Sequence, residues 1–396
     1  MGDSTDNPNG TVTDRVADLR SIAHDIAIAE ERTASALANA AVIWERRLRD
    51  GWAPPAGGAF PWEMTRLSLA ALVPGMKASG AWSERAGART AGPSKVVALV
   101  LAGNTPLLSW SPIAAALLAG HSVFAKMSRD ETLWPTLFRD VLAQVDPVVA
   151  ARLVLDVWPG DDPRTAELVR AADAVVAFGS DRTLAALRDV TPPTMPFFGY
   201  GHGISIGLVP GGSPDGDHGF ARDVLLYSQS GCLSPRAIFV EGSPDRARAF
   251  GKALASAMAG MARELVAPPV RDPAIAHAVR EARDMAHFEG AASSGSADLS
   301  WTVITHQMPS PVPLLGEHGV VSVIPIGNAV CDLRPLLGES VGYVTGAGVA
   351  GTVTGELEVL LASLGVSRIC PPGEMQTPPL DWPNGGRDLL ADLCGI

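Results

Sequence analysis

The sequence predicts an α/β protein with a doubly wound parallel sheet, followed by a second α/β domain. Short apolar runs such as residues 96–101 contain no alternating polar positions, which is typical of strands buried on both faces of a parallel sheet. Helical patterns separate these runs, and strands that alternate with helices predict β-α-β units. The Gly-rich passage at residues 199–203 interrupts this alternation before it starts again.

The composition agrees with a two-domain globular protein. The chain has 396 residues, of which 47% are hydrophobic and 18% are charged, and this length exceeds what one simple core usually serves. The formal net charge of -11 argues against a broad binding surface for nucleic acid or for an anionic membrane. A local basic pocket for a phosphorylated cofactor is compatible with that charge.

The N-terminal part of the chain is expected to be helical. Apolar residues at helical spacing predict a helix over residues 13–49, a Gly/Pro stretch ends it, and a shorter helix follows over residues 64–76. A polar loop is expected from there to Ser94. The expected strands of the first domain are residues 96–101, 121–126, 153–157 and 174–178.

The second series of strands is expected after the Gly-rich passage. Its members are residues 204–209, 237–240, 301–304, 320–326 and 341–345. We therefore predict a first domain over residues 1–203, a second over 204–370, and a Pro-rich tail over 371–396 that packs across the domains.

Targeting and metal signals are not found in the sequence. The polar, acidic start of the chain lacks the basic and apolar blocks of a secretory signal, and no apolar run is long enough to span a membrane. Four cysteines without a CxxC pair form neither a disulfide framework nor a zinc pattern. These observations predict a cytoplasmic protein in a reducing compartment, without a metal site.

The strongest local signal is the segment at residues 229–235, Gln-Ser-Gly-Cys-Leu-Ser-Pro. Small residues around Cys232 leave an open approach to its sulfur, as a catalytic thiol requires. A nearby helix terminus would favour the thiolate, depending on which end faces the sulfur. A packed cysteine is the alternative that the residues alone leave open. Cys331, Cys370 and Cys394 stand in ordinary packing or surface contexts.

Further candidates follow the predicted strands. Asn104 comes after the first strand, where ligands gather in open α/β sheets, and its amide suits an oxyanion, although it also suits a simple turn before Pro106. Gly179 and Ser180 precede a helix and suit a pyrophosphate, but Ser180 is equally suited to be a helix cap.

Two cations close another strand, and a histidine lies in the Gly-rich passage. Lys126 and Arg129, with Ser128 between them, suit a ribose and its 2′-phosphate, or are solvated surface charges. His202 suits either a turn or a proton transfer.

Taken in order, these segments resemble the acyl-CoA reductase family related to the fatty-acid reductase of bacterial bioluminescence, a branch of the aldehyde dehydrogenase superfamily. The 229–235 segment resembles the nucleophile motif of that family most closely, and residues 376–387 resemble its C-terminal signature. The resemblance covers residues 65 to 392. It implies an aldehyde dehydrogenase-like fold, with a Rossmann-like cofactor domain and an α/β catalytic domain.

The resemblance also implies roles for individual residues. It implies that Cys232 is the nucleophile, that Asn104 helps to hold the oxyanion, and that Lys126 and the Gly179–Ser180 turn contact the cofactor. The segment at residues 317–323 is similar to one whose Glu holds the nicotinamide ribose, which implies that role for Glu317.

One departure from the superfamily pattern indicates the direction of the reaction. Aldehyde-oxidising members carry a Glu in a Glu-Leu-Gly-Gly-Lys segment that activates water, whereas residues 200–204 here read Tyr-Gly-His-Gly-Ile. Without that base an acyl group on Cys232 is better protected from water. This favours reduction of an acyl thioester to an aldehyde over oxidation of an aldehyde.

The expected cofactor is NADPH, with NADH as the alternative, because Arg129 stands where many NAD-using relatives have a ribose-binding Glu. The acyl donor is coenzyme A or an acyl carrier protein. The resemblance also implies a homo-oligomer, because relatives in the superfamily usually form dimers or tetramers. Two other functions stay open: an aldehyde dehydrogenase acting oxidatively, and a non-catalytic protein that binds an acyl carrier.

Overall fold

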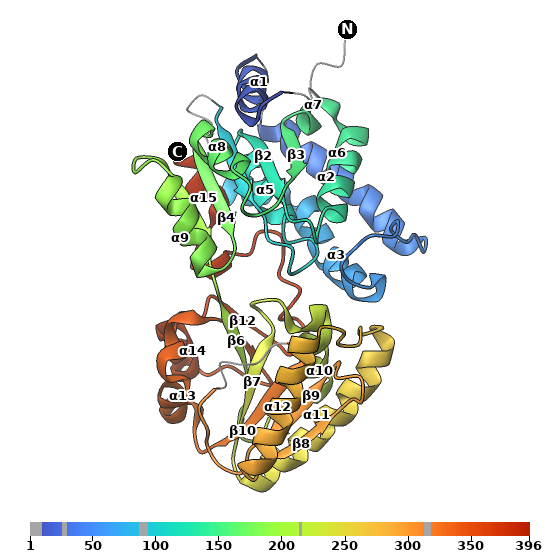
Figure 1. Cartoon of the computed structure of the whole chain (residues 1–396), viewed down its shortest axis with the longest axis vertical. Coiled ribbons are helices and arrows are strands. Elements are labelled where there is room, and N and C mark those ends of the chain that lie inside the picture. The colour runs from blue at the N-terminus through green and yellow to red at the C-terminus, as the bar shows by residue number, and fades with distance from the viewer. Residues whose placement is uncertain (1–9, 26–29, 87–93, 214–215, 313–317) are drawn as a thin grey trace. The chain divides into compact units, whose positions relative to one another are not determined.

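The computed structural model describes residues 10–25, 30–86, 94–213, 216–312 and 318–396. The chain divides into two compact units (Figure 1). Unit 1 consists of Met1–His202 together with Pro379–Ile396, and unit 2 consists of Gly203–Pro378. Each unit contains a largely parallel sheet covered by helices, which confirms the predicted α/β class.

The sheet of unit 1 is fully parallel and has the strand order β3-β2-β1-β4-β5. The chain first builds outward from β1 on one side and then returns to add β4 on the other, so the strand order reverses beside β1. Ligands of open α/β sheets bind at such a reversal, beyond the carboxyl ends of the strands. The strands are β1 (Val96–Val100), β2 (Ser122–Met127), β3 (Leu153–Val157), β4 (Ala174–Phe178) and β5 (Phe197–Tyr200).

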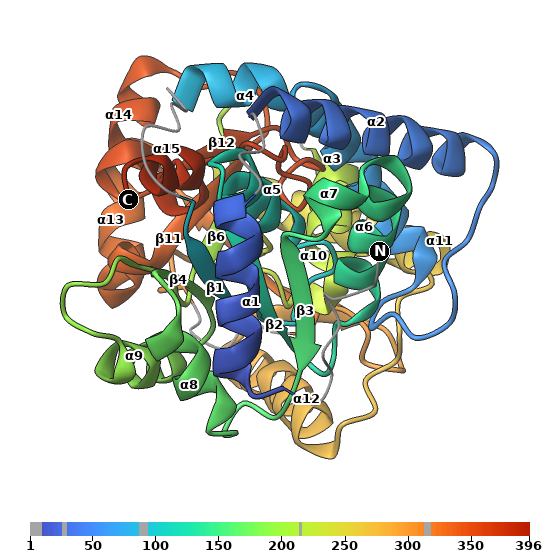
Figure 2. The same cartoon turned by 90° about the horizontal axis from the view of Figure 1, so that it is seen from above.

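Helices cover both faces of this sheet. One face packs against α1 (Val12–Asp25), α8 (Arg164–Ala171) and α9 (Asp181–Val190), and Figure 2 shows α1 lying along the strands. The opposite face packs against another set of helices. That set is α2 (Glu30–Arg49), α3 (Trp62–Lys77), α4 (Ser79–Ala86), α5 (Trp110–Leu118), α6 (Leu133–Val145), α7 (Pro147–Ala150) and α15 (Leu389–Cys394).

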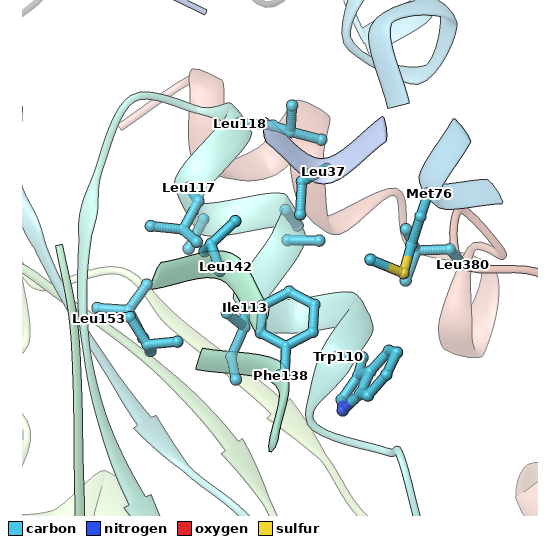
Figure 3. Packing of buried hydrophobic residues seen from close by; sticks show 14 of the residues in the cluster. Leu37, Met76, Trp110, Ile113, Leu117, Leu118, Phe138, Leu142, Leu153 and Leu380 are labelled. Carbon is cyan, nitrogen blue, oxygen red and sulfur yellow. The ribbon is translucent and has the colours of Figure 1, made fainter. Parts of the chain in front are cut away.

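Figure 3 shows the centre of this second face, where side chains from distant segments meet. Leu37 of α2, Met76 of α3 and Leu380 of the C-terminal segment pack with Trp110 and Ile113 of α5. All of these are buried. Because both faces are covered, the strands β1, β2 and β4 are buried at every position, which explains why β1 and β4 contain only apolar residues.

Three expectations about unit 1 were wrong. The helix expected over residues 13–49 is two helices, α1 and α2, and the expected polar loop before Ser94 contains α4. The Gly-rich passage that was expected to interrupt the sheet begins within strand β5. A Cβ on Gly199 would stand 3.0 Å from the Phe197 Cε1, which is a tight contact, so the neighbouring ring favours a glycine at this position of the strand.

The sheet of unit 2 has seven strands in the order β12-β11-β6-β7-β10-β9-β8, all parallel except the antiparallel β8. The expected strand over residues 341–345 begins later, because a 3₁₀ turn occupies Gly338–Tyr343. The strands are β6 (Ile204–Val209), β7 (Pro235–Glu241), β8 (Ala292–Gly295), β9 (Thr302–Thr305), β10 (Val320–Ile326), β11 (Val344–Val349) and β12 (Arg368–Cys370).

Two groups of helices cover the sheet of unit 2 (Figure 1). On one face α13 (Ala329–Leu337) and α14 (Gly355–Ser363) pack against β6, β7, β10 and β11. On the other lie α10 (Asp217–Leu225), α11 (Pro244–Glu264) and α12 (Pro273–Phe288). Throughout the described ranges of both units, no helix is long and apolar enough to cross a membrane.

Candidate active site

In unit 1 the candidate residues meet at the carboxyl ends of β1, β2 and β4. The Leu101 N–H donates to the carbonyl of Lys126 at 3.0 Å, which joins the ends of β1 and β2. A Cβ on Gly103 would stand 2.7 Å from the Ser128 Oγ, so only glycine allows the two loops to approach this closely. Asn104 follows directly and is exposed, which leaves its side chain accessible to a ligand at this edge.

Two cations stand at the end of β2 in different environments. Lys126 is only 7% exposed, and burial, assisted by Arg129, lowers the pKa of its ammonium, with Asp130 opposing. Arg129 is exposed. The Ser128 hydroxyl between them accepts the N–H of Asp130 at 3.3 Å. A buried ammonium and an exposed guanidinium three residues apart suit a ligand that carries hydroxyl and phosphate groups.

Glu131 lies beside these cations and was not among the expected residues. It is 5% exposed, its Oε1 accepts the Trp134 N–H at 3.0 Å, and burial raises the pKa of its carboxyl to about 7. Its position just before α6 is the signal that sequence reading could have used, because acidic side chains favour helix N-termini. Its observed contact is structural: it caps α6.

At the end of β4 the expected pyrophosphate turn is also a helix cap. The Gly179 N–H donates to the Tyr200 carbonyl at 3.2 Å, and the Ser180 hydroxyl accepts the Thr183 N–H at 3.2 Å. Asp181, which the sequence did not single out, accepts the N–H of His202 at 3.2 Å. His202 itself is exposed. The Ser180 hydroxyl therefore caps α9, and the main-chain N–H groups of this turn are what could contact a ligand.

In unit 2 Cys232 lies in a tight turn at the amino ends of the parallel strands. It follows the 3₁₀ helix Leu226–Gln229 and precedes β7. The Ser234 N–H donates to the Gly231 carbonyl at 3.0 Å, which closes the turn around Cys232. The Ser205 hydroxyl, at the start of β6, donates to the Cys232 carbonyl at 2.8 Å.

The chain enters this turn through an unusual backbone conformation. Tyr227, Ser228 and Gln229 have φ values of 56°, 51° and 63°, which lie in the left-handed region that side chains other than glycine rarely adopt. Gln229 holds the strained segment in place, because its buried amide donates to the carbonyls of Pro235 at 2.9 Å and Val320 at 2.8 Å. The segment that leads into the turn is therefore attached to β7 and β10.

The surroundings of the sulfur are close-packed on one side. A Cβ on Gly203 would stand 3.3 Å from the Cys232 Cβ and 2.8 Å from the Thr345 Cγ2, so this position has no room for a larger residue. Cys232 itself is partly exposed. Burial raises the pKa of its thiol, and its own main-chain N–H opposes this only in part. The thiol form is therefore favoured in the isolated chain.

The remaining cysteines differ from Cys232 in setting. All four are free thiols. Cys331 is exposed, and burial raises the pKa of Cys370 and of Cys394 to about 11. None of these three stands in a turn with such main-chain anchors. Glu317 lies outside the described residues. In the part of the chain that is described, no cluster of three potential metal ligands occurs.

Comparison with known proteins gives one family and one fold. The sequence model of the acyl-CoA reductase (LuxC) family matches residues 82–394, which is most of the chain. No match was found among curated proteins.

Solved structures with a similar fold are aldehyde dehydrogenases and PnpE from Pseudomonas sp. WBC-3. An NAD-dependent benzaldehyde dehydrogenase from Corynebacterium glutamicum has a TM-score of 0.71 at 15% identity, with 95% of this chain and 86% of that chain covered. PnpE has a TM-score of 0.72 at 13% identity, with 96% of this chain and 85% of that chain covered. A variant of aldehyde dehydrogenase C from Pseudomonas syringae, with NAD+ and octanal bound, gives 0.62 at 15%, with 91% and 81% covered. The expected aldehyde dehydrogenase-like fold is thereby confirmed.

Proposed function

This chain belongs to the acyl-CoA reductase (LuxC) family, and on that premise we propose that it reduces an acyl thioester to an aldehyde through an acyl group carried on Cys232. Membership makes the chain an oxidoreductase that forms or handles aldehydes. The observation that supports the finer proposal is the Cys232 turn. Its backbone is anchored by Ser205 and by the closure between Gly231 and Ser234, and the cysteine is still partly exposed.

In the proposed reaction the Cys232 sulfur attacks the thioester carbonyl carbon. A new S–C bond forms, the C–S bond to the donor breaks, and the donor thiol leaves with its electron pair. That departure is easy because the pKa of a thiol lies near about 8.5. The raised pKa of Cys232 means that its proton must first be removed, and His202 is our candidate to accept it.

The negative oxygen that forms during this attack needs hydrogen-bond donors. We assign that role to the Asn104 amide and to the main-chain N–H of Cys232. Asn104 is exposed at the carboxyl end of β1, where its amide is accessible to a substrate. One such donor contributes about 3 kcal/mol to lowering the barrier.

The cofactor proposed for the reaction is NADPH, with NADH as the alternative. The close approach of Gly103 to Ser128 and the two cations at the end of β2 fit a ribose that carries a 2′-phosphate, which Lys126 and Arg129 would hold. When bound, the nicotinamide would supply the hydride that the acyl carbon needs. Cys232 then leaves with its electron pair and the aldehyde is released. The role that we keep for Gly179 and Ser180 is contact with the diphosphate through the main chain.

We propose the direction of the reaction from the carboxylates that are available near His202. Residues 200–204 contain none, and the nearby Asp181 accepts the His202 N–H, so it is already engaged. An acyl group on Cys232 would therefore have no carboxylate from this segment to activate water. The rival function is oxidation of an aldehyde, and it is favoured by the aldehyde dehydrogenases among the solved structures of similar fold.

Assays in both directions separate these functions. Acyl-CoA substrates of increasing length and acyl carrier protein thioesters are tested with NADPH and with NADH, and aldehydes are tested with NADP+ and NAD+. We expect thioester-dependent NADPH oxidation and an acyl adduct on Cys232 by mass spectrometry. Net aldehyde oxidation without thioester reduction would contradict the proposal.

The matched variants are Cys232→Ala and Cys331→Ala. The first is expected to reduce turnover roughly 10⁴-fold or more, as removal of a nucleophile does. The second removes an exposed cysteine and should retain wild-type activity. Full retention of function by Cys232→Ala would favour a protein that only binds an acyl carrier. All four cysteines are free thiols, and we propose that the protein is cytoplasmic, where thiols stay reduced. The assay buffer should therefore contain a reducing agent.

A further inference from the structure

An aspartate is fully buried in unit 2, a few residues before the turn at residues 231–234 that contains Cys232, here called the nucleophile turn. Asp223 lies on the buried face of α10 with Phe220 and Val224, and none of its surface is exposed. Burial raises the pKa of its carboxyl to about 7, although the main-chain N–H groups around it act in the opposite direction. A carboxyl group held at this cost needs a structural or functional reason.

Both oxygens of the Asp223 carboxylate have main-chain donors. Oδ2 accepts the Gly373 N–H at 2.6 Å, and Oδ1 accepts the Met375 N–H at 3.1 Å. Two converging N–H groups need two acceptors. An asparagine of the same size would direct its NH₂ at one of them, so only a carboxylate satisfies both. Asp223 therefore fixes the backbone of residues 371–377, here called the C-terminal clamp.

The C-terminal clamp also packs directly on α10. A Cβ on Gly219 would stand 2.5 Å from the carbonyl carbon of Pro372, so the two backbones touch at this glycine. Met375 is buried, and its Sδ would be 2.5 Å from a Cβ on Gly348 in β11. The clamp is thus seated between α10 and the sheet of unit 2.

The main chain of the same aspartate holds the nucleophile turn. Its carbonyl accepts the Ser234 hydroxyl at 2.7 Å and lies 3.5 Å from the Gln376 Nε2. Ser234 is buried, and its N–H closes the turn around Cys232. The C-terminal clamp and the nucleophile turn are therefore both attached to Asp223, the clamp through its side chain and the turn through its carbonyl.

We propose that Asp223 is a positioning residue, which sets the direction of Cys232 by holding the nucleophile turn, through Ser234, in a fixed place relative to the C-terminal clamp. This rests on the proposed role of Cys232 as the nucleophile. Three left-handed residues lie directly before this turn, and such a strained backbone persists only where the surrounding structure holds it. Correct orientation of the sulfur matters because the rate of attack depends steeply on geometry.

Two variants separate this role from simple packing. Ser234→Ala removes the hydroxyl that reaches Asp223 and leaves the aspartate and its clamp contacts in place. Asp223→Asn keeps the volume but loses one of the two acceptors. The matched control is Asp272→Asn, at the start of α12 in the same unit, whose carboxylate also accepts two main-chain N–H groups, those of Ala274 and Ile275.

Four quantities are measured for each folded variant: kcat in thioester reduction, the cofactor KM in the same reaction, the alkylation rate of Cys232 by iodoacetamide, and the Tm. A small alkylating reagent needs no fixed orientation, whereas an acyl thioester held in a site does. We expect Ser234→Ala and Asp223→Asn to lower kcat tenfold or more. The cofactor KM should stay within twofold and Cys232 alkylation within threefold, and Asp272→Asn should keep wild-type kcat.

The outcomes distinguish this inference from the function on which it rests. A wild-type protein that reduces no thioester, although Cys232 is alkylated, overturns both. An active wild type with fully active Ser234→Ala and Asp223→Asn overturns only the positioning role. Parallel losses in kcat, alkylation and Tm would show that Asp223 supports the fold alone, and would also overturn it.

Discussion

The two units place their candidate residues in opposite ways. In unit 1 they stand in loops beyond the carboxyl ends of the strands, and Asn104 and Arg129 are exposed there. In unit 2 Cys232 stands before the amino end of β7, and its turn is attached to β6, α10 and β10 through Ser205, Ser234 and Gln229. Exposed loops such as those of unit 1 tolerate substitution. The Cys232 turn of unit 2 is instead attached to the packed interior.

This difference means that function and stability should separate in unit 1 and stay linked in unit 2. A residue that only presents its side chain to a ligand can be changed without loss of folding free energy. A residue that holds the proposed nucleophile in place cannot be changed in this way, because the same contacts contribute to catalysis and to folding free energy. Substitutions in each unit test this contrast.

Among the substitutions that compare the two units, the largest effect is expected for Asn104→Ala in unit 1. Removal of an oxyanion donor lowers kcat by about 10²–10³-fold. Because Asn104 is exposed, the free energy of unfolding should change by less than about 0.5 kcal/mol. Steady-state kinetics and thermal unfolding check the two halves of this prediction. Asn104→Asp, which keeps the size but lacks the amide donor, should behave in the same way, and an unchanged kcat would exclude Asn104 from the oxyanion site.

A smaller effect, but on both properties, is expected for Gly203→Ala in unit 2. The added methyl would press on the Thr345 Cγ2 at 2.8 Å and on the Cys232 Cβ at 3.3 Å. Overpacking of this kind destabilises by about 1–3 kcal/mol. We expect kcat to fall together with the Tm, since the displaced neighbour includes the nucleophile.

The control for this substitution is Gly260→Ala in α11, where a Cβ meets nothing within 4 Å. It should leave kcat unchanged and stabilise the helix by about 0.5–1 kcal/mol. Thr345→Ser in the Gly203→Ala background removes the nearest methyl group and retains the hydroxyl that donates to the Ile204 carbonyl. Recovery of kcat in this double variant would support the packing explanation, and a Gly203→Ala protein with normal kcat and Tm would refute the link between the two.

The same contrast explains what the sequence could predict. Strand ends and helix starts are local features, so the positions of Lys126, Gly179 and Asn104 at one sheet edge followed from the pattern of β1, β2 and β4. The cysteine turn was also recognisable from its own residues. Its supports were not, because the 371–377 segment is about 150 residues from Asp223 and meets it only in the fold, and nothing local pairs Ser205 or Asp223 with the turn.

Some signals were present but ambiguous without a structure. Asp223 falls on the apolar face of its helix, three residues after Phe220 and next to Val224, and an acid at such a position indicates a buried partner. The sequence does not say which partner.

Ser180 fitted both a phosphate contact and a cap, and only the Thr183 N–H showed that the hydroxyl serves as a cap. Strand β5 was hidden because its glycine and its short length weaken the strand pattern.

The smallest expected effect concerns a contact within unit 1 between residues that are distant in the sequence and lie apart from the candidate site. His121 is 5% exposed, its Nδ1 accepts the Lys95 N–H at 3.3 Å, and its Nε2 lies 2.9 Å from the Leu393 carbonyl in α15. The ring is therefore neutral, with its proton on Nε2. Burial lowers the pKa of His121 below its usual 6.5, since the charged ring would be desolvated.

The sign of the pH effect follows from this lowered pKa. As the pH falls through 6.5 the unfolded chain binds a proton at His121 before the folded chain does, so the free energy of unfolding decreases until the lower folded pKa is reached. The decrease is at most about 1.4 kcal/mol for each pH unit in that window. The difference in Tm between wild type and His121→Gln should shift in favour of the variant from pH 7.5 to 5.5, whereas the exposed His277→Gln should track the wild type.

Turnover per folded molecule should be unaffected at pH 7.5, because His121 anchors α15 and not the loops that carry Asn104 and Arg129. A variant that lost turnover at an unchanged Tm would show that the attachment and the site of unit 1 are coupled, and the contrast with unit 2 would fail.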